Sequence, residues 1–268
     1  MSALLRVEGL SKRYRRGDRE FAALDGVSFE IAPGETLALV GPSGSGKSTV
    51  ARILLRLVEP DAGSIRFNGE ELLGLRGAAL RATRTKLQMV FQDPLAAFNP
   101  RATVARLIDD PLRIHGIVGR ADRPKAIAAL LERVGLAAEL AGRRVHEISG
   151  GQRQRLAIAR ALSTRPALIV LDEAVSALDV LVRADILGLL AELQRDEGVA
   201  YLFISHDLGT VRAMARRIAI MDGGRIVEHG DAATVIASPA SSTGRALVAA
   251  TPELPVFPGL PAFKETVS

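Results

Sequence analysis

The chain has 268 residues, of which 48% are hydrophobic and 24% are charged, a balance typical of a globular protein and not of a disordered or fibrous one. It contains no cysteine, which excludes disulfides, thiol nucleophiles and cysteine-ligated metal sites. A net charge of +5 is compatible with nucleic-acid binding, but the arginines are scattered and aromatic residues make up only 4%, so we expect no nucleic-acid partner.

The first part of the chain is predicted to hold a strand, a glycine loop and a helix in direct succession. Residues 4–8 and 23–31 alternate between apolar and polar side chains, as half-buried strands do. A turn then leads into the short apolar run Thr36–Val40, and a helical pattern follows over residues 48–57.

The loop between that strand and that helix fits the phosphate-loop pattern G-x-x-x-x-G-K-[ST]. The matching run is Gly41-Pro42-Ser43-Gly44-Ser45-Gly46-Lys47-Ser48. Glycines let successive backbone N–H groups converge on one anion, and the helix that follows points its positive end at the same place. Lys47 can reach the outer phosphates, and the Ser48 hydroxyl can ligate Mg²⁺. The alternative is a glycine-rich turn with a chance lysine, but the position between a strand and a helix favours the phosphate loop.

The middle of the chain is predicted to be mostly helical, after strands at residues 64–67 and 88–91. The helical patterns cover residues 104–112, 124–134 and 152–162. We therefore expect a helical subdomain, over about residues 93–165, inserted into an α/β core.

A second cluster of glycine and polar residues opens the last of these helices. It consists of Ser149, Gly150, Gly151 and Gln152. Ser149 suits an N-cap, and the two glycines leave N–H groups exposed at a positive helix end, which predicts another phosphate site. Helix capping is the alternative; it accounts for Ser149 but not for two glycines. One chain needs only one phosphate site for a single nucleotide, so the second site is surplus.

An acidic pair, Asp172 and Glu173, ends the apolar run of residues 167–171. Open α/β sheets bind ligands at the carboxyl ends of their strands. Asp172 therefore suits Mg²⁺ coordination, and Glu173 suits polarising the water that attacks a phosphate. The alternative is an ordinary strand end that turns into solvent, and the phosphate loop makes it the weaker interpretation.

The last third of the chain is predicted to add strands at residues 200–204 and 217–221 and then a loosely packed extension over 237–268, where Pro, Ser and Thr become frequent. No apolar stretch approaches the ~20 residues needed to cross a bilayer. Arg6 and Glu8 interrupt the segment where an export signal would be apolar. We expect a cytosolic chain that can still dock on a membrane protein.

These motifs, in this order, resemble those of the nucleotide-binding subunits of ABC transporters, over nearly the whole chain to about residue 236. Residues 149–152 resemble the signature motif of that family, with Ile148 where leucine is more usual. The resemblance implies that Gln92 senses Mg²⁺ and contacts a permease, and that residues 176–179 cross a dimer interface. It also implies that His206 contacts the γ-phosphate and that Tyr14 stacks on adenine.

The resemblance implies an α/β fold, with a P-loop NTPase core of the ABC type over residues 1–236, a mostly helical subdomain and a small antiparallel β region. It implies an ATPase that uses ATP and Mg²⁺, with Glu173 and His206 as catalytic residues. The implied metal ligands are Ser48, Gln92 and Asp172. The implied nucleotide contacts are Tyr14, Gly41, Pro42, Ser43, Gly44, Ser45, Gly46, Lys47, Ser48, Thr49, Gln92, Ser149, Gly150, Gly151 and Gln152.

The family also accounts for the surplus phosphate site, because in ABC proteins the signature motif of one subunit caps the nucleotide held by the other. A chain with one copy of each motif is then expected to pair with itself or with a related ATPase subunit. The resemblance further implies membrane permease subunits, a peripheral position at the cytoplasmic face of the membrane, and an indirect link to an extracytoplasmic solute-binding protein.

Several stretches resemble one branch in particular, the importers of peptides and nickel. They are residues 88–93 with 99–101, residues 172–179, and residues 242–247 followed by Pro252. An ABC ATPase of another system, for another solute or an exporter, is the alternative. A soluble ABC ATPase of repair or translation usually carries two nucleotide domains or a long coiled-coil insertion, and this sequence has neither. A P-loop kinase or GTPase would not need residues 149–152, and a GTPase would carry an Asn-Lys-x-Asp motif that this sequence lacks.

Overall fold

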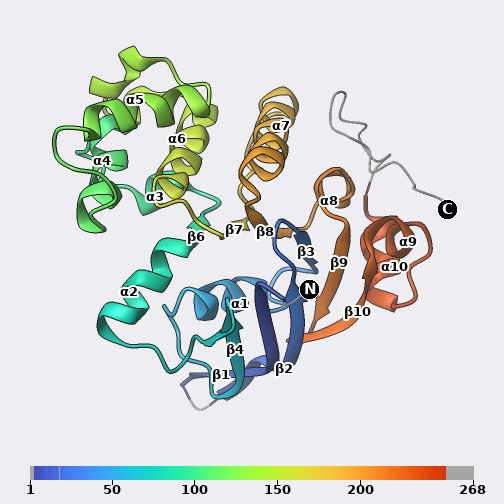
Figure 1. Cartoon of the computed structure of the whole chain (residues 1–268). Coiled ribbons are helices and arrows are strands. Elements are labelled where there is room, and N and C mark those ends of the chain that lie inside the picture. Colours follow the sequence, from blue (N-terminus) through green and yellow to red (C-terminus); the bar gives the residue numbers. More distant parts are fainter. Residues whose placement is uncertain (1–2, 18, 252–268) are drawn as a thin grey trace.

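The main sheet of the protein is parallel except for one edge strand, as seen in a computed structural model that describes residues 3–17 and 19–251 (Figure 1). In spatial order its strands are β10 (Arg225–Asp231), β9 (Arg217–Asp222), β3 (Thr36–Val40), β8 (Ala200–Ser205), β7 (Leu168–Asp172) and β6 (Leu87–Val90). Only β10 runs antiparallel to its neighbour. The predicted strands β3, β6, β7, β8 and β9 are confirmed to within one residue, because strands buried on both faces give nearly unbroken apolar runs.

A second, antiparallel sheet has the order β2-β1-β4-β5. Its strands are β1 (Leu5–Arg16), β2 (Arg19–Ile31), β4 (Ala62–Phe67) and β5 (Glu70–Glu71). The prediction that the first strand ends at Glu8 is wrong: β1 continues for eight more residues, to Arg16. The pairing of β1 with β2 shifts register between Val7 and Leu10 and again before Arg13. These irregularities break the apolar–polar alternation on which the sequence prediction relied.

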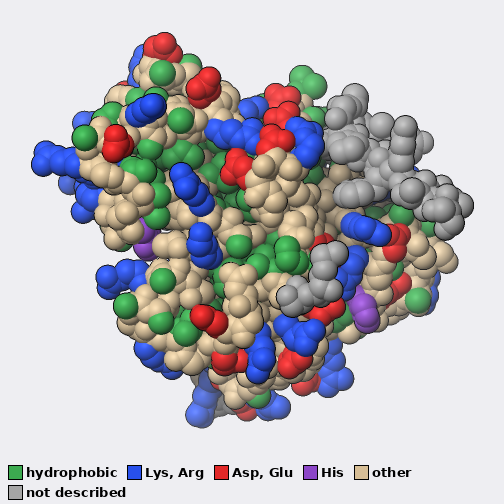
Figure 2. Space-filling model, viewed as in Figure 1, with side chains coloured by type: hydrophobic (Ala, Val, Ile, Leu, Met, Phe, Trp, Pro, Cys, Tyr) green, Lys and Arg blue, Asp and Glu red, His purple; other side chains and the backbone are tan. Residues whose placement is uncertain are grey.

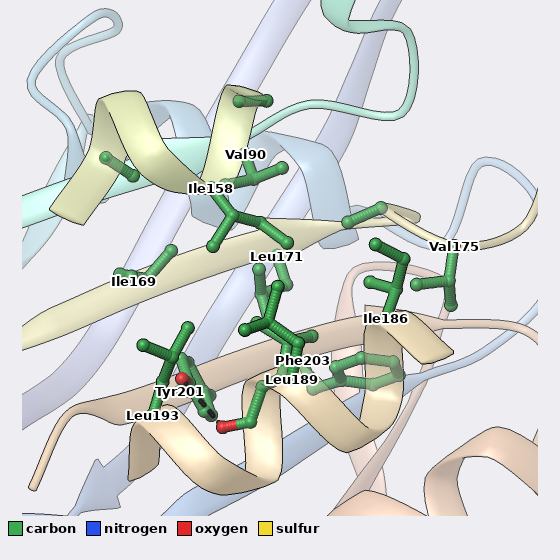
Figure 3. Close-up of a cluster of buried hydrophobic side chains, with 14 of the residues drawn as sticks. Val90, Ile158, Ile169, Leu171, Val175, Ile186, Leu189, Leu193, Tyr201 and Phe203 are labelled. Carbon is green, nitrogen blue, oxygen red and sulfur yellow. Dashed lines mark hydrogen bonds between the residues drawn. The ribbon is translucent and has the colours of Figure 1, made fainter. Parts of the chain in front are cut away.

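Apolar cores cover both faces of the main sheet. Along β7, Leu168 and Val170 face the core that includes helix α1 (Lys47–Leu54), while Ile169 and Leu171 face the core on the other side. Figure 3 shows this second core, where helix α7 (Val180–Glu197) packs on β7 and β8. The carboxyl ends of the strands, and the loops that follow them, are therefore held by packing on two sides.

The helical segment after β6 confirms the three predicted helices to within two residues. It contains α3 (Pro94–Ala97), α4 (Val104–Ile114), α5 (Arg123–Arg133), two short 3₁₀ turns (Ala138–Gly142 and Val145–Glu147) and α6 (Gly150–Leu162). These helices lie together beyond the β6 edge in Figure 1. Arg133 joins the segment to the end of α7 through Asp196 and Glu197, with N–O distances of 3.0 Å to each. That residues 93–165 form a separable subdomain stays a prediction.

The remaining helices are α2 (Gly77–Lys86), α8 (Leu208–Met214), α9 (Ala232–Ala237) and α10 (Ser242–Ala249), and the sequence predicted none of them. The expectation of loose packing is wrong for residues 238–251. Glu228 accepts hydrogen bonds from the backbone N–H groups of Ala240 and Ser241 at 2.7 and 2.9 Å, and Leu247 packs against the core. Pro252 and the rest of the extension, to residue 268, lie outside the described residues.

The surface seen in Figure 2 carries Lys and Arg interspersed with Asp and Glu. A cleft between α5, α6 and α7 is lined by charges of both signs, among them Arg133, Arg155, Asp185 and Glu192. Within residues 3–17 and 19–251, no helix is both long and apolar enough to cross a membrane.

Loss of one buried hydroxyl is expected to lower stability measurably. The ring of Tyr201 on β8 is fully buried, and its hydroxyl donates a hydrogen bond of 3.0 Å to the carbonyl of Leu190 on α7. Tyr201→Phe should lower the free energy of unfolding by about 1 kcal/mol, measured by urea denaturation. Tyr14→Phe changes the only other tyrosine, on a partly exposed strand, and should leave stability within about 0.5 kcal/mol. Equal stability of Tyr201→Phe and the parent chain would contradict the expectation.

Candidate functional site

The predicted phosphate loop connects the buried strand β3 to helix α1 in a conformation that requires glycine. Gly41 has φ +154°, and a Cβ atom there would lie 2.1 Å from the carbonyl oxygen of Met221. Gly46 has φ +107°, and its Cβ atom would lie 2.4 Å from the carbonyl oxygen of Ala23. Positive φ and close backbone approach both exclude larger residues. The loop is thus pressed between β9 and β2.

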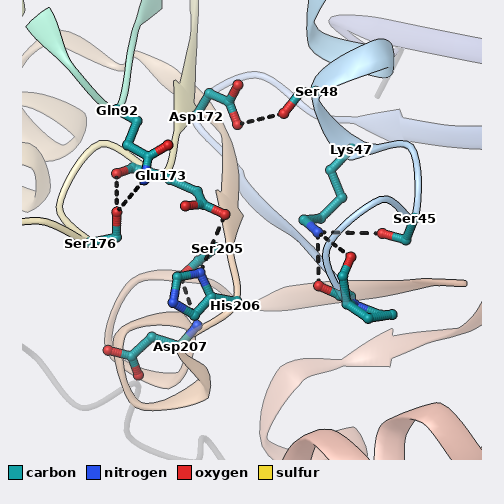
Figure 4. Close-up of polar contacts among 12 residues, drawn as sticks. Ser45, Lys47, Ser48, Gln92, Asp172, Glu173, Ser176, Ser205, His206 and Asp207 are labelled. Atoms are coloured by element: carbon teal, nitrogen blue, oxygen red, sulfur yellow. Dashed lines mark hydrogen bonds and ion pairs between the residues drawn. The ribbon is translucent and has the colours of Figure 1, made fainter.

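Lys47 lies under this loop with its ammonium group turned into it (Figure 4). The side chain is nearly buried, and Nζ donates to the carbonyls of Gly41 and Pro42 at 2.8 and 2.9 Å. Burial lowers the pKa of Lys47, and the nearby carboxylates of Glu173 and Asp172 oppose that change. The Lys47 amine thus lies in the loop, where it can bond the anionic oxygens of a phosphate.

A hydroxyl from the start of α1 meets a carboxyl group from the end of β7. Ser48 Oγ donates to Asp172 Oδ1 at 3.4 Å. Burial raises the pKa of Asp172, because desolvation disfavours the charged form. No cluster of three or more His, Cys, Asp or Glu side chains suited to a metal occurs in the described residues. One hydroxyl and one carboxylate fit Mg²⁺, which keeps several waters and phosphate oxygens among its ligands, and do not fit a metal held by protein alone.

Glu173 and His206 lie side by side at the ends of β7 and β8. His206 Nδ1 is 3.3 Å from Glu173 Oε1 (Figure 4). The backbone N–H of Glu173 donates to the carbonyl of Ile204 at 2.9 Å, which extends the pairing of the two strands by one residue. Glu173 has φ +49°, a left-handed conformation that is uncommon for a residue with a side chain. Such backbone strain often occurs at functional sites, where it directs a side chain.

Gln92 reaches the same edge of the sheet from the end of β6. Its Nε2 atom lies 3.5 Å from Ser176 Oγ, and that hydroxyl donates to the carbonyl of Glu173 at 2.9 Å. In the described part of the chain, Gln92 makes no hydrogen bond to Ser48 or Asp172, the other two predicted metal ligands. The structure therefore brings Lys47, Ser48, Asp172, Glu173, His206 and Gln92 together at one edge of the sheet.

Residues 149–152 lie elsewhere, at the start of α6 in the helical segment. Ser149 Oγ accepts a hydrogen bond from the backbone N–H of Gln152 at 3.2 Å, and Gln152 Oε1 accepts one from the backbone N–H of Ser149 at 2.9 Å. This reciprocal arrangement is a capping box, which satisfies two backbone N–H groups at the start of α6. A Cβ atom on Gly151 would lie 2.6 Å from Val182 Cγ1, whereas one on Gly150 would meet open space. Packing against α7 thus explains why residue 151 is a glycine. No local contact explains why residue 150 is one.

Tyr14 lies on β1 opposite Phe21 on β2, with ring centroids 5.8 Å apart. Phe21 is 52% exposed, so the pair presents an aromatic surface. The ammonium of Lys12 lies 5.7 Å from the centroid of the Tyr14 ring. Stacking of Tyr14 on adenine stays a prediction, and Phe21 is a neighbour that the sequence did not single out.

Sequence reasoning also missed the role of Asp207, which follows the predicted histidine. Asp207 is the N-cap of α8, and its Oδ1 accepts hydrogen bonds from the backbone N–H groups of Gly209 and Thr210. The signal was available, because an aspartate just before a helical segment is a common N-cap.

Comparisons with known proteins agree on one family. A family model described as "ABC transporter" matches residues 24–176. The glutathione import ATP-binding protein GsiA of Escherichia coli K12 is 50% identical over 256 residues, and that of Salmonella paratyphi A is 51% identical over 257 residues. Each alignment covers 93% of this chain and 41% of the relative. The chain thus spans less than half the length of these relatives.

Two similar solved structures are also ABC proteins. The dimeric, post-hydrolysis ATP-binding cassette MJ0796 bound to ADP and Pi is 28% identical, with a TM-score of 0.76, over 85% of this chain and 98% of that one. CbiO1 from Clostridium perfringens, part of the ABC transporter complex cbiONQ, is 28% identical, with a TM-score of 0.77, over 89% of this chain and 92% of that one.

Proposed function

Because this chain belongs to the ABC transporter family, we propose that it is the subunit that binds and hydrolyses ATP to energise an importer. It has the α/β P-loop fold of that family. The observation that carries the proposal is the convergence of Lys47, the Ser48–Asp172 pair and the Glu173–His206 pair at the carboxyl edge of the main sheet. We assign the nucleotide-binding domain to residues 1–236, with the helical subdomain at about 93–165.

The phosphate loop binds the triphosphate. The loop residues 41–46, with Ser48 and Thr49 at the start of α1, surround the phosphates with N–H groups, and Lys47 supplies the positive charge. Ser48, Asp172 and Gln92 hold Mg²⁺, which neutralises charge on the phosphate oxygens when it is bound. Tyr14 stacks on the adenine.

Glu173 and His206 carry out the hydrolysis. Glu173 orients a water molecule and accepts its proton while the water oxygen attacks the γ-phosphorus. The bond from the γ-phosphorus to the bridging oxygen breaks, and ADP and phosphate leave. His206 contacts the γ-phosphate, and its Nδ1 atom lies 3.3 Å from Glu173 Oε1.

A second ATPase subunit completes each site. Residues 149–152 cap the nucleotide bound by the partner, with the N–H groups at the start of α6 directed to its phosphates. One observation supports this: Gly150 faces open space, and the capping of Ser149 by Gln152 does not require a glycine there. The solved cassette MJ0796 is itself a dimer. The partner is a second copy of this chain or a related chain.

The cargo we favour is a peptide. GsiA is named for the import of glutathione, which is a tripeptide, and residues 172–179 resemble the peptide and nickel branch. Nickel is the second candidate, and another solute or an exporter is the third. The subunit acts at the cytoplasmic face of the membrane on permease subunits, which receive cargo from an extracytoplasmic binding protein.

Purification of the tagged full-length chain from membranes in mild detergent tests the assembly. We expect permease subunits to copurify, together with a second ATPase unless the chain pairs with itself. Uptake of labelled glutathione, a labelled dipeptide and nickel, in cells with the parent chain or with Glu173→Gln, then identifies the cargo. The proposal fails if the purified assembly hydrolyses no ATP and contains no membrane protein.

The signature residues can be tested by complementation between two inactive variants. Ser149→Arg should abolish hydrolysis at the partner's site and leave its own phosphate loop intact, because the long charged side chain blocks the start of α6. Lys47→Ala has the opposite defect. A mixture of the two variants forms some dimers in which one composite site is fully intact, so we expect ATPase activity to return in part. No recovery on mixing, with Ser149→Arg unable to bind ATP itself, would show that residues 149–152 serve their own subunit.

A further inference from the structure

One arginine outside every predicted motif joins the two loops that carry the hydrolytic residues. Arg183 lies in the first turn of α7. Its Nη1 atom donates to Asp207 Oδ2 at 2.8 Å, and its Nη2 atom donates to the carbonyl of Leu178 at 3.1 Å. The Arg183 and Asp207 side chains are 21% and 22% exposed. A pair this deep is screened by salt less than a surface pair.

Asp207 is held firmly by this contact and by its own helix. While Oδ1 caps α8, Oδ2 also accepts a hydrogen bond of 2.9 Å from Thr210 Oγ1. The backbone N–H of Asp207 donates to Ser205 Oγ at 3.0 Å. His206 thus lies between two anchored residues, so its ring position depends on where Asp207 is held.

The other end of the contact lies in the loop that follows Glu173. Ser176 Oγ donates to the carbonyl of Glu173 at 2.9 Å, and the backbone N–H of Leu178 donates to the carbonyl of Val175 at 3.3 Å. These bonds make residues 173–178 one folded turn. Arg183 therefore connects the turn that carries Glu173 to the loop that carries His206.

We propose that Arg183 is a positioning residue for ATP hydrolysis, which holds the His206 loop against the Glu173 turn by bonding Asp207 and the Leu178 carbonyl at once. This inference rests on the proposed function. The hydrogen bonds of Arg183 go to Asp207 and Leu178, so it acts on Glu173 and His206 through their neighbours. A planar guanidinium can bond two acceptors in different directions, whereas the single ammonium of lysine serves them less well. Residues 176–179 also belong to the loop proposed to face the second subunit, so Arg183 links subunit pairing to His206.

Steady-state kinetics of the full-length chain give the first test. Arg183→Ala should lower kcat for ATP hydrolysis by about tenfold or more, because a small displacement of a catalytic group is costly. KM for ATP should change little, since the phosphate loop is untouched. Arg183→Lys should recover part of kcat. Arg195→Ala is the matched control: it removes an arginine from the same helix, 70% exposed and paired with Asp196, and should leave kcat unchanged.

The histidine NMR spectrum gives a readout that a purely structural role would not move. The chain has four histidines, and His206→Gln identifies the His206 ring resonance. We expect that resonance to shift in Arg183→Ala, or in Arg183→Lys if the alanine variant does not fold, and to stay in place in Arg195→Ala. An unmoved His206 resonance overturns the inference whether or not kcat falls, and so does an unchanged kcat. Absence of ATP hydrolysis by the parent chain would instead overturn the proposed function.

Discussion

Replacing Glu173 with glutamine is expected to lower kcat for ATP hydrolysis by about 10²–10⁴-fold, the range lost when a general base is removed. The amide has the size of the carboxylate but cannot accept the proton of the attacking water. Apart from the contact with His206, the bonds of residue 173 do not depend on the carboxylate: Ser176 binds its backbone carbonyl, and its backbone N–H binds Ile204. The variant should therefore fold normally and bind ATP with nearly unchanged affinity.

A consequence of this variant is a trapped dimer. If ATP is held between the phosphate loop of one subunit and residues 149–152 of another, a subunit that binds but does not hydrolyse ATP should stay paired. Size-exclusion chromatography with light scattering should show a dimer of Glu173→Gln with Mg-ATP and a smaller species without nucleotide. If pairing needs a related chain, the dimer forms when that chain is added.

The control for Glu173→Gln is the same change at a surface carboxylate. Glu30 is about half exposed and pairs with Arg6 at 3.4 Å, an interaction of little energetic weight. Glu30→Gln should hydrolyse ATP at the parent rate and form no trapped dimer. Near-normal hydrolysis by Glu173→Gln would refute the assignment of Glu173 as the general base.

The parts of the site that could be predicted from sequence are formed by residues that are consecutive in the chain. The phosphate loop is eight consecutive residues, and each glycine has a backbone reason that the structure makes visible at Gly41 and Gly46. The acidic pair follows an apolar run, and a buried parallel strand leaves such a run in any sequence. The motif order and the strands together were enough to predict the edge of the sheet where these residues lie.

The parts that could not be predicted depend on contacts between distant residues. Arg183 and Asp207 are separated by 24 positions, and nothing in a single sequence selects that pair among its many arginines and aspartates. Helix α7 was missed for another reason. Val180 and Leu181 are 65% and 80% exposed, so the apolar residues of this helix do not keep to one face, and the periodic signal is weak.

The helix start at Ser149 shows a third kind of limit. A pattern of serine and two glycines predicted exposed N–H groups, and the structure shows instead a reciprocal cap between Ser149 and Gln152 and a packing constraint at Gly151. A phosphate site and a capped, packed helix start both account for Ser149, Gly151 and Gln152. Only Gly150 favours the phosphate site, because neither capping nor packing requires a glycine at that position.

Lys47→Ala is expected to abolish measurable ATP binding. The ammonium of Lys47 is the positive charge buried against the phosphate loop, and a charge-assisted bond to a phosphate is among the stronger polar interactions in proteins. Its loss should weaken ATP binding by about a hundredfold or more. Calorimetric titration in the Glu173→Gln background keeps turnover from interfering. Lys86→Ala, which removes an exposed ammonium 3.4 Å from the carbonyl of Arg165, should bind ATP like the parent chain.

Lys47→Ala should change ATP binding without a large change in the stability of the fold. Burial lowers the pKa of Lys47, which means that folding disfavours the charged ammonium relative to the unfolded chain. Removing the group eliminates that unfavourable term while it also removes hydrogen bonds to Gly41 and Pro42. The two changes oppose each other, so Tm without nucleotide should move by only a few degrees. The rise in Tm that ATP gives the parent chain should disappear, because a ligand stabilises only the state that it binds. A Lys47→Ala protein that ATP still stabilises would place the nucleotide somewhere other than this loop.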